Sequence, residues 1–160
     1  MSDIISQLVR EDLINLHVNV DDQSQLLEIL SDDLYQKGYV LDSFREAIIK
    51  REREFPTGLQ LEEIAVAIPH TYAQHIKVPF IYINQLESPI SFIQMGTDEE
   101  EVQVSYVVVL GISKPQEQTG LLAELMEIFG NTDFINRMQM VNSEKDLYNL
   151  FKTQTIIGGY

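Results

Sequence analysis

Val102-Gln103-Val104-Ser105-Tyr106-Val107-Val108-Val109-Leu110-Gly111-Ile112 is the stretch of sequence that decides the fold class. Its second half is apolar on both faces of an extended chain, which is typical of a central strand covered by helices on each side. Apolar patterns of period two and of period 3.6 alternate around it, so the chain contains both strands and helices. The sequence therefore predicts one α/β (α+β) domain, with a mixed central sheet of about five strands and helices on both faces.

The periodicity of the apolar residues also predicts where the elements lie. We expect strands at residues 14–20, 64–68, 80–86, 90–95 and 102–112, and helices at residues 22–37, 43–55, 117–129, 132–140 and 144–152. Asp21 or Asp22 is a candidate cap for the first long helix, and Ser43 with Glu46 is a candidate capping box for the next. No internal repeat or linker interrupts the pattern, so residues 1–160 are interpreted as a single domain with a core at about 10–152.

Composition excludes several classes of function. A formal net charge of −14 argues against nucleic acid, which is bound through clustered Lys and Arg. With no cysteine, the chain has no disulfide, thiolate metal site or thiol nucleophile. No apolar run reaches the length of about 20 residues that a membrane helix needs, and no basic, apolar leader is seen. We therefore expect a cytoplasmic protein that does not insert into a membrane.

His70 is the first candidate for chemistry. The apolar run Ile64-Ala65-Val66-Ala67-Ile68 ends at Pro69, and His70 follows directly. A neutral imidazole has a free lone pair near pH 7, and a stiff proline fixes the backbone from which the ring projects. Taken alone, such a residue is more often a structural or surface histidine, but together with the neighbouring candidates we interpret His70 as a covalent nucleophile.

Arg51 and Gln118 are predicted to face inward near this histidine. Arg51 falls on the apolar stripe of its helix, and Gln118 does the same in the first turn of a later helix, just after Pro115. A guanidinium on that stripe binds an anion or extends to water, and an amide at a helix start caps it or holds phosphate oxygens. We expect both to be catalytic, with Arg51 holding a phosphoryl group and Gln118 positioning the ring or the phosphate.

The remaining candidates are Thr71 and His75, for phosphate binding or positioning. His70 and His75 are five residues apart, a spacing that suits neither a helix face nor a strand face, so no metal is expected. His17 falls on the polar side of its strand and receives no role. No nucleotide-binding motif occurs, and no cofactor is expected.

Taken together, these segments resemble a known family. Arg51-Glu52, Pro56-Thr57-Gly58-Leu59, the block from Ile64 to Thr71, and His75-Ile76-Lys77-Val78-Pro79 are similar to the enzyme IIA components of the bacterial sugar phosphotransferase system. The resemblance is to the fructose–mannitol type, and within it most to the galactitol-specific branch.

The resemblance implies a phosphotransferase with a phosphohistidine intermediate. His70 would accept a phosphoryl group from the phosphocarrier protein HPr and pass it to a cysteine of an enzyme IIB component during sugar uptake, with galactitol as the expected sugar. Arg51 is implied to assist, and Gln118 stands where the mannitol branch carries a second active-site histidine. Two alternatives stay open: a regulatory domain phosphorylated on His70 for signalling, and an unrelated small-molecule binding domain.

Overall fold

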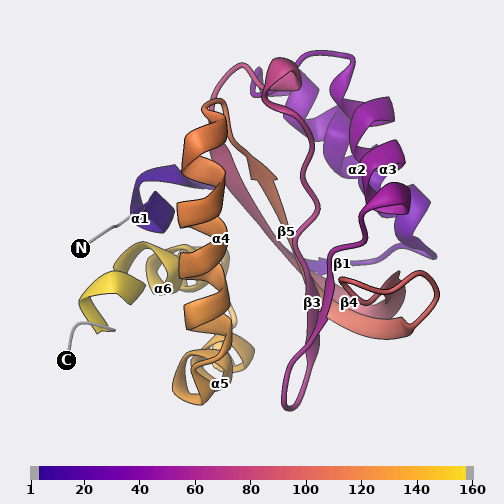
Figure 1. Cartoon of the computed structure of the whole chain (residues 1–160). Helices are drawn as coiled ribbons and strands as arrows, with labels where there is room; N and C mark the ends of the chain where they lie inside the picture. Colours follow the sequence, from indigo (N-terminus) through magenta and orange to yellow (C-terminus); the bar gives the residue numbers. More distant parts are fainter. Residues whose placement is uncertain (1–3, 158–160) are drawn as a thin grey trace.

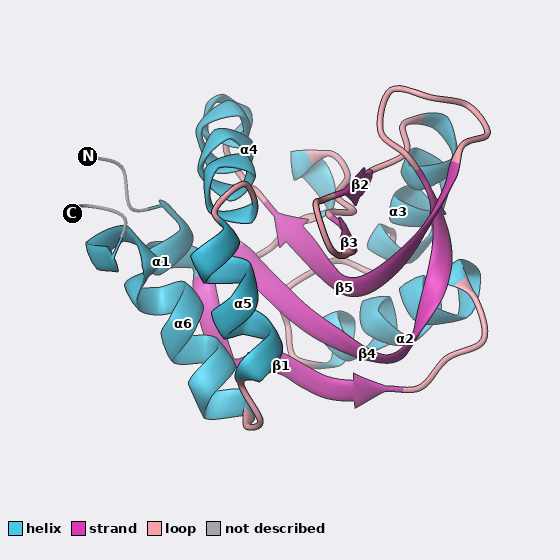
Figure 2. Ribbon diagram, turned by 90° about the horizontal axis from the view of Figure 1, so that it is seen from below, coloured by secondary structure: helices cyan, strands magenta, loops and turns pink. Residues whose placement is uncertain are grey.

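A computed structural model describes residues 4–157 and shows three layers, with a mixed sheet between two groups of helices (Figures 1 and 2). The sheet has five strands in the order β1-β4-β5-β3-β2. β1 pairs with β4 and β3 pairs with β5 in parallel, whereas β4 with β5 and β2 with β3 are antiparallel. The strands are β1 (Val9–Val18), β2 (Gly58–Gln60), β3 (Ala65–Ala67), β4 (Phe80–Ile93) and β5 (Glu101–Gly111).

The helices divide between the two faces of the sheet (Figure 2). α1 (Ile4–Leu8), α4 (Pro115–Phe129), α5 (Thr132–Met140) and α6 (Glu144–Ile157) cover one face. α2 (Gln23–Gln36) and α3 (Phe44–Glu54) cover the other, and a short 3-10 helix, η1 (Ala73–His75), lies between β3 and β4. The predicted fold class, a single α/β domain with a mixed sheet and helices on both faces, is confirmed.

β5 contributes to the hydrophobic core on both sides of the sheet. Tyr106, Val108 and Leu110 join the core cluster under α4, α5 and α6, whereas Val107 and Val109 join the cluster under α2 and α3. All five side chains are buried, because successive residues of a strand point to opposite faces. This double burial is the reason why the stretch lacks a polar face.

Of the two predicted N-terminal helix caps, the structure shows one and lacks the other. Asp22 caps α2, with its carboxylate accepting a hydrogen bond from the backbone N–H of Gln25 at 2.9 Å. The predicted capping box of Ser43 and Glu46 is wrong, because Ser43 makes no side-chain cap and its hydroxyl instead contacts His75. α3 ends at Glu54, ahead of Pro56, as the missing amide of proline requires.

Several boundaries differ from the sequence prediction. The strands expected at 80–86 and 90–95 are one strand, β4, whose register shifts between Gln85 and Ile90 around the exposed Glu87-Ser88-Pro89. β1 begins at Val9 rather than at residue 14, and β2 and α1 were not predicted because each spans only three to five residues. The helical period of the apolar residues also places Met126 on the inner face of the helix expected at 117–129, but Met126 is 47% exposed in α4. Among the described residues, no helix is long and apolar enough to cross a membrane.

Candidate functional site

His70 lies just beyond the end of β3, where the chain still runs beside β5. The Leu110 amide donates to the Pro69 carbonyl at 3.0 Å, and His70 itself pairs with Leu110 as an isolated parallel bridge. The next residue on β5, Gly111, has no room for a side chain, because a Cβ there would lie 2.1 Å from the Phe80 ring. The backbone that carries His70 is therefore anchored to the central strand.

The His70 ring has one nitrogen engaged by the backbone. Nδ1 lies 2.8 Å from the carbonyl oxygen of Ile68. Since a carbonyl oxygen can only accept, Nδ1 is the donor and carries the proton, so the lone pair of the neutral ring is on Nε2. The bond to Ile68 thus fixes both the tautomer and the orientation of the ring.

Burial and a nearby cation keep this ring neutral. Burial lowers the pKa of His70 below its ordinary value of 6.5, and the charge of Arg51 lowers this pKa further, while the bond to Ile68 opposes both effects. A histidine with a lowered pKa holds an available lone pair at neutral pH.

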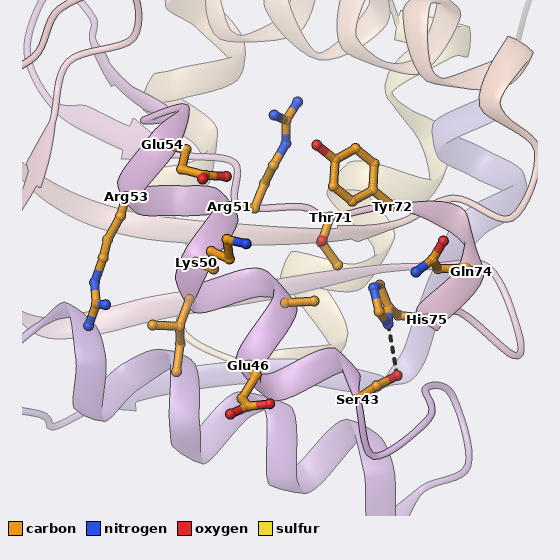
Figure 3. Close-up of a pocket in the computed structure, with 12 residues that line it drawn as sticks. Ser43, Glu46, Lys50, Arg51, Arg53, Glu54, Thr71, Tyr72, Gln74 and His75 are labelled. Carbon is orange, nitrogen blue, oxygen red and sulfur yellow. Dashed lines mark hydrogen bonds between the residues drawn. The ribbon is translucent and has the colours of Figure 1, made fainter.

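A pocket of about 730 Å³ opens beside this histidine, between α3 and the segment that follows His70 (Figure 3). Of the predicted site residues, Arg51, Thr71 and His75 line it, whereas His70 and Gln118 do not. Side chains alternate along a paired strand, so Thr71 faces the α3 side with Ala67, and His70 faces the α4 side with Ile68. Thr71, which directly follows the predicted nucleophile His70, is therefore the first residue of this segment that lines the pocket.

Arg51 is held by two aromatic rings. Its Cζ atom lies 3.9 Å from the centroid of the Phe55 ring and 5.1 Å from that of Tyr72. Arg51 is half-buried, and Figure 3 shows its guanidinium beside the Tyr72 ring at the edge of the pocket. The expectation that Arg51 faces inward is met only in part, because its side chain is half-buried and contacts the ring of Phe55, which is 56% exposed.

Thr71 has an unusual hydroxyl group. The residue is only 6% exposed, and Oγ1 finds no hydrogen-bond partner in the part of the chain that the structure describes. Buried polar groups are normally paired, and an unpaired one costs roughly 1–3 kcal/mol. Such a donor at the pocket is suited to bind an oxygen of an incoming group.

His75 lies on the rim of the pocket and contacts α3. Its Nδ1 is 2.8 Å from the Ser43 hydroxyl, a bond drawn as a dashed line in Figure 3. Within residues 4–157, no group of three or more potential metal ligands comes together. His17 lies far along the chain on β1, with Nδ1 at 3.1 Å from Glu87 and a side chain 71% exposed.

Gln118 lies in the first turns of α4, three residues after Pro115, and is half-buried. No hydrogen bond joins it to the His70 ring in the described structure. α4 and His70 lie on the same side of the sheet, so the amide remains a prediction rather than an observed part of the pocket.

The sequence reasoning missed a buried carboxylate next to Arg51. Glu52 is 2% exposed and accepts hydrogen bonds from both the amide and the hydroxyl of Thr57, each at 2.8 Å. Burial raises the pKa of Glu52 to about 7, although the bonds from Thr57 and the charge of Arg51 oppose this. A signal was available, because Glu52 follows Ile48 by one helical turn and so borders the apolar stripe.

Glu52 is also connected to the His70 loop through the backbone. The Thr57 carbonyl accepts a hydrogen bond from the Ile68 amide at 3.3 Å, and the Ile68 carbonyl orients the His70 ring. The Glu52 carboxyl group therefore holds Thr57 in place, and Thr57 in turn is hydrogen-bonded to the chain just after β3.

Comparisons with known proteins agree with this fold and with the motifs. The chain is 37% identical over 117 residues to the galactitol-specific EIIA component of the PTS system from Escherichia coli strain K12, which covers 73% of this chain and 77% of that protein. Two solved structures share the fold. The nitrogen regulatory protein IIA-Ntr from Neisseria meningitidis superposes with a TM-score of 0.74 at 21% identity, covering 92% of this chain and 99% of that one.

The second structure is the complex of enzyme IIAMTL and phosphorylated enzyme IIBMTL from Escherichia coli, with a TM-score of 0.70 at 16% identity, covering 89% of this chain and 96% of that one. The family described as "Phosphoenolpyruvate-dependent sugar phosphotransferase system, EIIA 2" matches residues 7–154, nearly the whole chain. The resemblance to the fructose–mannitol type is confirmed, and the chain belongs to this family of phosphotransferase proteins.

Proposed function

We propose that this protein relays a phosphoryl group through His70, from phosphorylated HPr to a cysteine of an enzyme IIB component, during uptake of a hexitol. The observation that carries the proposal is an imidazole with Nδ1 bound to the Ile68 carbonyl at 2.8 Å, while Nε2 has no hydrogen-bond partner among the described residues. Galactitol is the proposed sugar, because the relative with 37% identity is a galactitol-specific component. The reaction is proposed to take place in the cytoplasm.

The first transfer moves the phosphoryl group onto His70. The Nε2 lone pair attacks phosphorus, and the phosphorus–nitrogen bond to the donor imidazole breaks, with its electron pair leaving on the donor. Nδ1 keeps its proton, and its bond to Ile68 stabilises the charge that the ring gains. Phosphoryl transfer depends mostly on positioning and electrostatics, so this fixed ring is well suited to it.

The second transfer reverses these roles. A cysteine thiolate of the IIB component attacks phosphorus, the bond to Nε2 breaks, and its electron pair returns to the imidazole. Both donor and acceptor are protein side chains, so neither step requires a nucleotide. The IIA–IIB complex of the mannitol system has the same fold on its IIA side, which supports a IIB component as the partner.

The neighbouring side chains are proposed to bind the phosphoryl oxygens. Arg51 supplies the charge, since it already acts electrostatically on His70. The unpaired Thr71 hydroxyl supplies a hydrogen bond, and Gln118 donates its amide from the α4 side. His75, fixed by Ser43, is assigned a supporting position on the rim.

Reconstitution tests the site directly. The protein is incubated with phosphoenolpyruvate, enzyme I and HPr, and acid-labile phosphate on histidine is measured. We expect labelling of the wild type and of His17→Ala, and none of His70→Ala. Labelling of His70→Ala on another histidine would overturn the assignment. A Gln118→Ala variant that transfers at the wild-type rate would remove Gln118 from the site.

Transfer from the labelled protein to a panel of purified IIB components tests the substrate and the role together. Loss of label to a galactitol-type IIB component supports transport of that sugar. Transfer only to another IIB component would replace galactitol, and a stable label with every IIB component would favour the regulatory alternative.

A further inference from the structure

Arg51 is the arginine whose charge acts on His70, and the two rings around it have no evident packing role. Phe55 and Tyr72 are each 56% exposed and lie outside both core clusters. They come from different segments, since Phe55 caps the C-terminal end of α3 and Tyr72 precedes η1. Their shared feature is the guanidinium of Arg51, which stacks on both rings.

We propose that Phe55 and Tyr72 are positioning residues that hold the Arg51 guanidinium at the edge of the pocket without a carboxylate partner, so that its charge and its N–H groups stay available to the phosphoryl group. This inference rests on the proposed function and adds two residues to it. Neither ring touches the reacting atoms, so both act through Arg51.

Two of the other arginines show what this arrangement avoids. Arg45 pairs with Glu28 and Asp32, and Arg137 pairs with Asp133 at 3.1 Å, whereas Arg10 donates to the Pro79 carbonyl. Arg51 has no carboxylate within 4.0 Å in the described residues, although Glu52 and Glu54 flank it on α3. Arg53 also has no carboxylate within this distance among the described residues, so the feature that sets Arg51 apart is its contact with two aromatic rings.

The two acids that flank Arg51 on α3 form no ion pair with it among the described residues. Both oxygens of Glu52 accept hydrogen bonds from Thr57, and the charge of Arg51 acts on this carboxyl group only through its effect on the pKa. Glu54 lies at the same end of α3 in Figure 3, and it forms no ion pair with Arg51 among the described residues. Among the described residues, the Arg51 guanidinium therefore contacts the two aromatic rings and forms no ion pair.

An aromatic ring binds a guanidinium differently from a carboxylate. The negative face of the ring attracts the flat face of the cation, and the five N–H groups in the plane of the cation remain free. A carboxylate occupies those N–H groups and competes with a phosphoryl group for them. Stacking therefore fixes the position of Arg51 without neutralising the edge that would bind phosphate.

The same rings have a second possible use, as an apolar surface for the partner protein. Substitution of each ring by leucine distinguishes the two uses. Leucine keeps most of the apolar area but has no π face, so it preserves an apolar contact and removes the stack. Phenylalanine at position 72 and tyrosine at position 55 keep the π face.

The test is the rate of phosphoryl transfer from phosphorylated HPr, measured over a range of HPr concentrations for Phe55→Leu, Tyr72→Leu and the double variant. We expect the maximal rate to fall about threefold for each and about tenfold for both, with KM unchanged. Tyr72→Phe and Phe55→Tyr should transfer at the wild-type rate. NMR should show the Arg51 Hε resonance losing its ring-current shift in the leucine variants.

A double-mutant cycle completes the test. If the rings act through Arg51, Phe55→Leu has no further effect in an Arg51→Ala background. The proposal is overturned if the leucine variants keep the wild-type maximal rate, if they raise KM alone, or if they slow transfer equally with and without Arg51. Failure of the wild type to become labelled would instead refute the proposed function, and the Arg51 resonance would still report on the stack.

Discussion

The two ends of helix α3 carry the same residue types in opposite circumstances. At the N-terminal end, Arg45 is exposed and pairs with Glu28 and with Asp32, the latter at 3.6 Å. At the C-terminal end, Arg51 stacks on aromatic rings, and its neighbour Glu52 is buried against Thr57. The helix dipole favours a cation at this second end, where Arg51 lies in the last turn.

The difference shows that the surroundings, and not the residue type, decide whether a charge is available for chemistry. The Arg45 charge is neutralised on the surface by carboxylates of α2, where an ion pair contributes little to stability. The Arg51 charge reaches His70 and lowers its pKa. The C-terminal end of α3 is thus the end that serves the site, and substitutions at matched positions can test this.

The largest effect is expected for the arginines. Arg51→Ala should lower the rate of phosphoryl transfer by about 100-fold, because a charged donor to the phosphoryl group is lost. Arg45→Ala should leave the rate within about twofold of the wild type and change the free energy of unfolding by less than about 1 kcal/mol. The measurement is transfer from phosphorylated HPr, with unfolding in urea as the control for folding.

Equal transfer rates for the two alanine variants would contradict the proposed difference between the two ends of α3. Arg51→Lys sharpens it, since lysine keeps the charge but loses the planar fork. A rate for Arg51→Lys between those of the wild type and Arg51→Ala is expected.

The second effect is a change in stability with pH, caused by Glu52. Its pKa is raised to about 7 in the folded protein from an ordinary value of 4.5, so the folded state binds more protons than the unfolded state between these values. The free energy of unfolding should therefore fall as pH rises through this window, by up to about 3 kcal/mol. Glu52→Gln should remove this part of the pH dependence.

Urea unfolding between pH 5 and pH 8 measures the effect, and Glu46→Gln at the other end of α3 is the matched control. Glu46→Gln should keep the wild-type pH dependence. His70 contributes with the opposite sign, because its lowered pKa makes stability rise with pH below 6.5, and this part should persist in Glu52→Gln. An unchanged pH profile in Glu52→Gln would mean that the carboxyl is not protonated in the fold.

The fold was largely predictable because most elements carry their signal locally. β5 is apolar on both faces, α2 has its aspartate cap, and the helix predicted at residues 132–140 has the observed bounds of α5. The short β2 was missed, because three residues give no measurable periodicity. Its position depends on pairing with β3 and on Gly58, where a Cβ would lie 2.6 Å from the Ile93 carbonyl.

The residues that form the site were easier to predict from the sequence than the contacts between them. Periodicity and the Pro69-His70 boundary indicated where His70 and Arg51 would lie, and the charge of Arg51 contributes, after burial, to the lowered pKa of His70. The partner of Arg51 was not predictable, because Tyr72 belongs to a different segment of the chain. Gln118 shares the α4 side with His70, and its role stays a prediction.

The smallest effect is expected at the N-terminal end of α3, from Ser43→Ala. A serine that caps a helix typically contributes about 1 kcal/mol, but Ser43 makes no such bond, and its hydroxyl lies 2.8 Å from His75 Nδ1. Ser43→Ala should therefore lower the free energy of unfolding by less than about 0.5 kcal/mol, whereas Asp22→Ala, which removes an observed cap, should lower it by about 1 kcal/mol. The His75 ring should gain mobility in Ser43→Ala, visible as broadened or shifted ring resonances, because its described hydrogen bond is lost. A loss of stability as large as that of Asp22→Ala would show that Ser43 caps α3 in solution, and the hydroxyl would then belong to the helix rather than to the rim of the pocket.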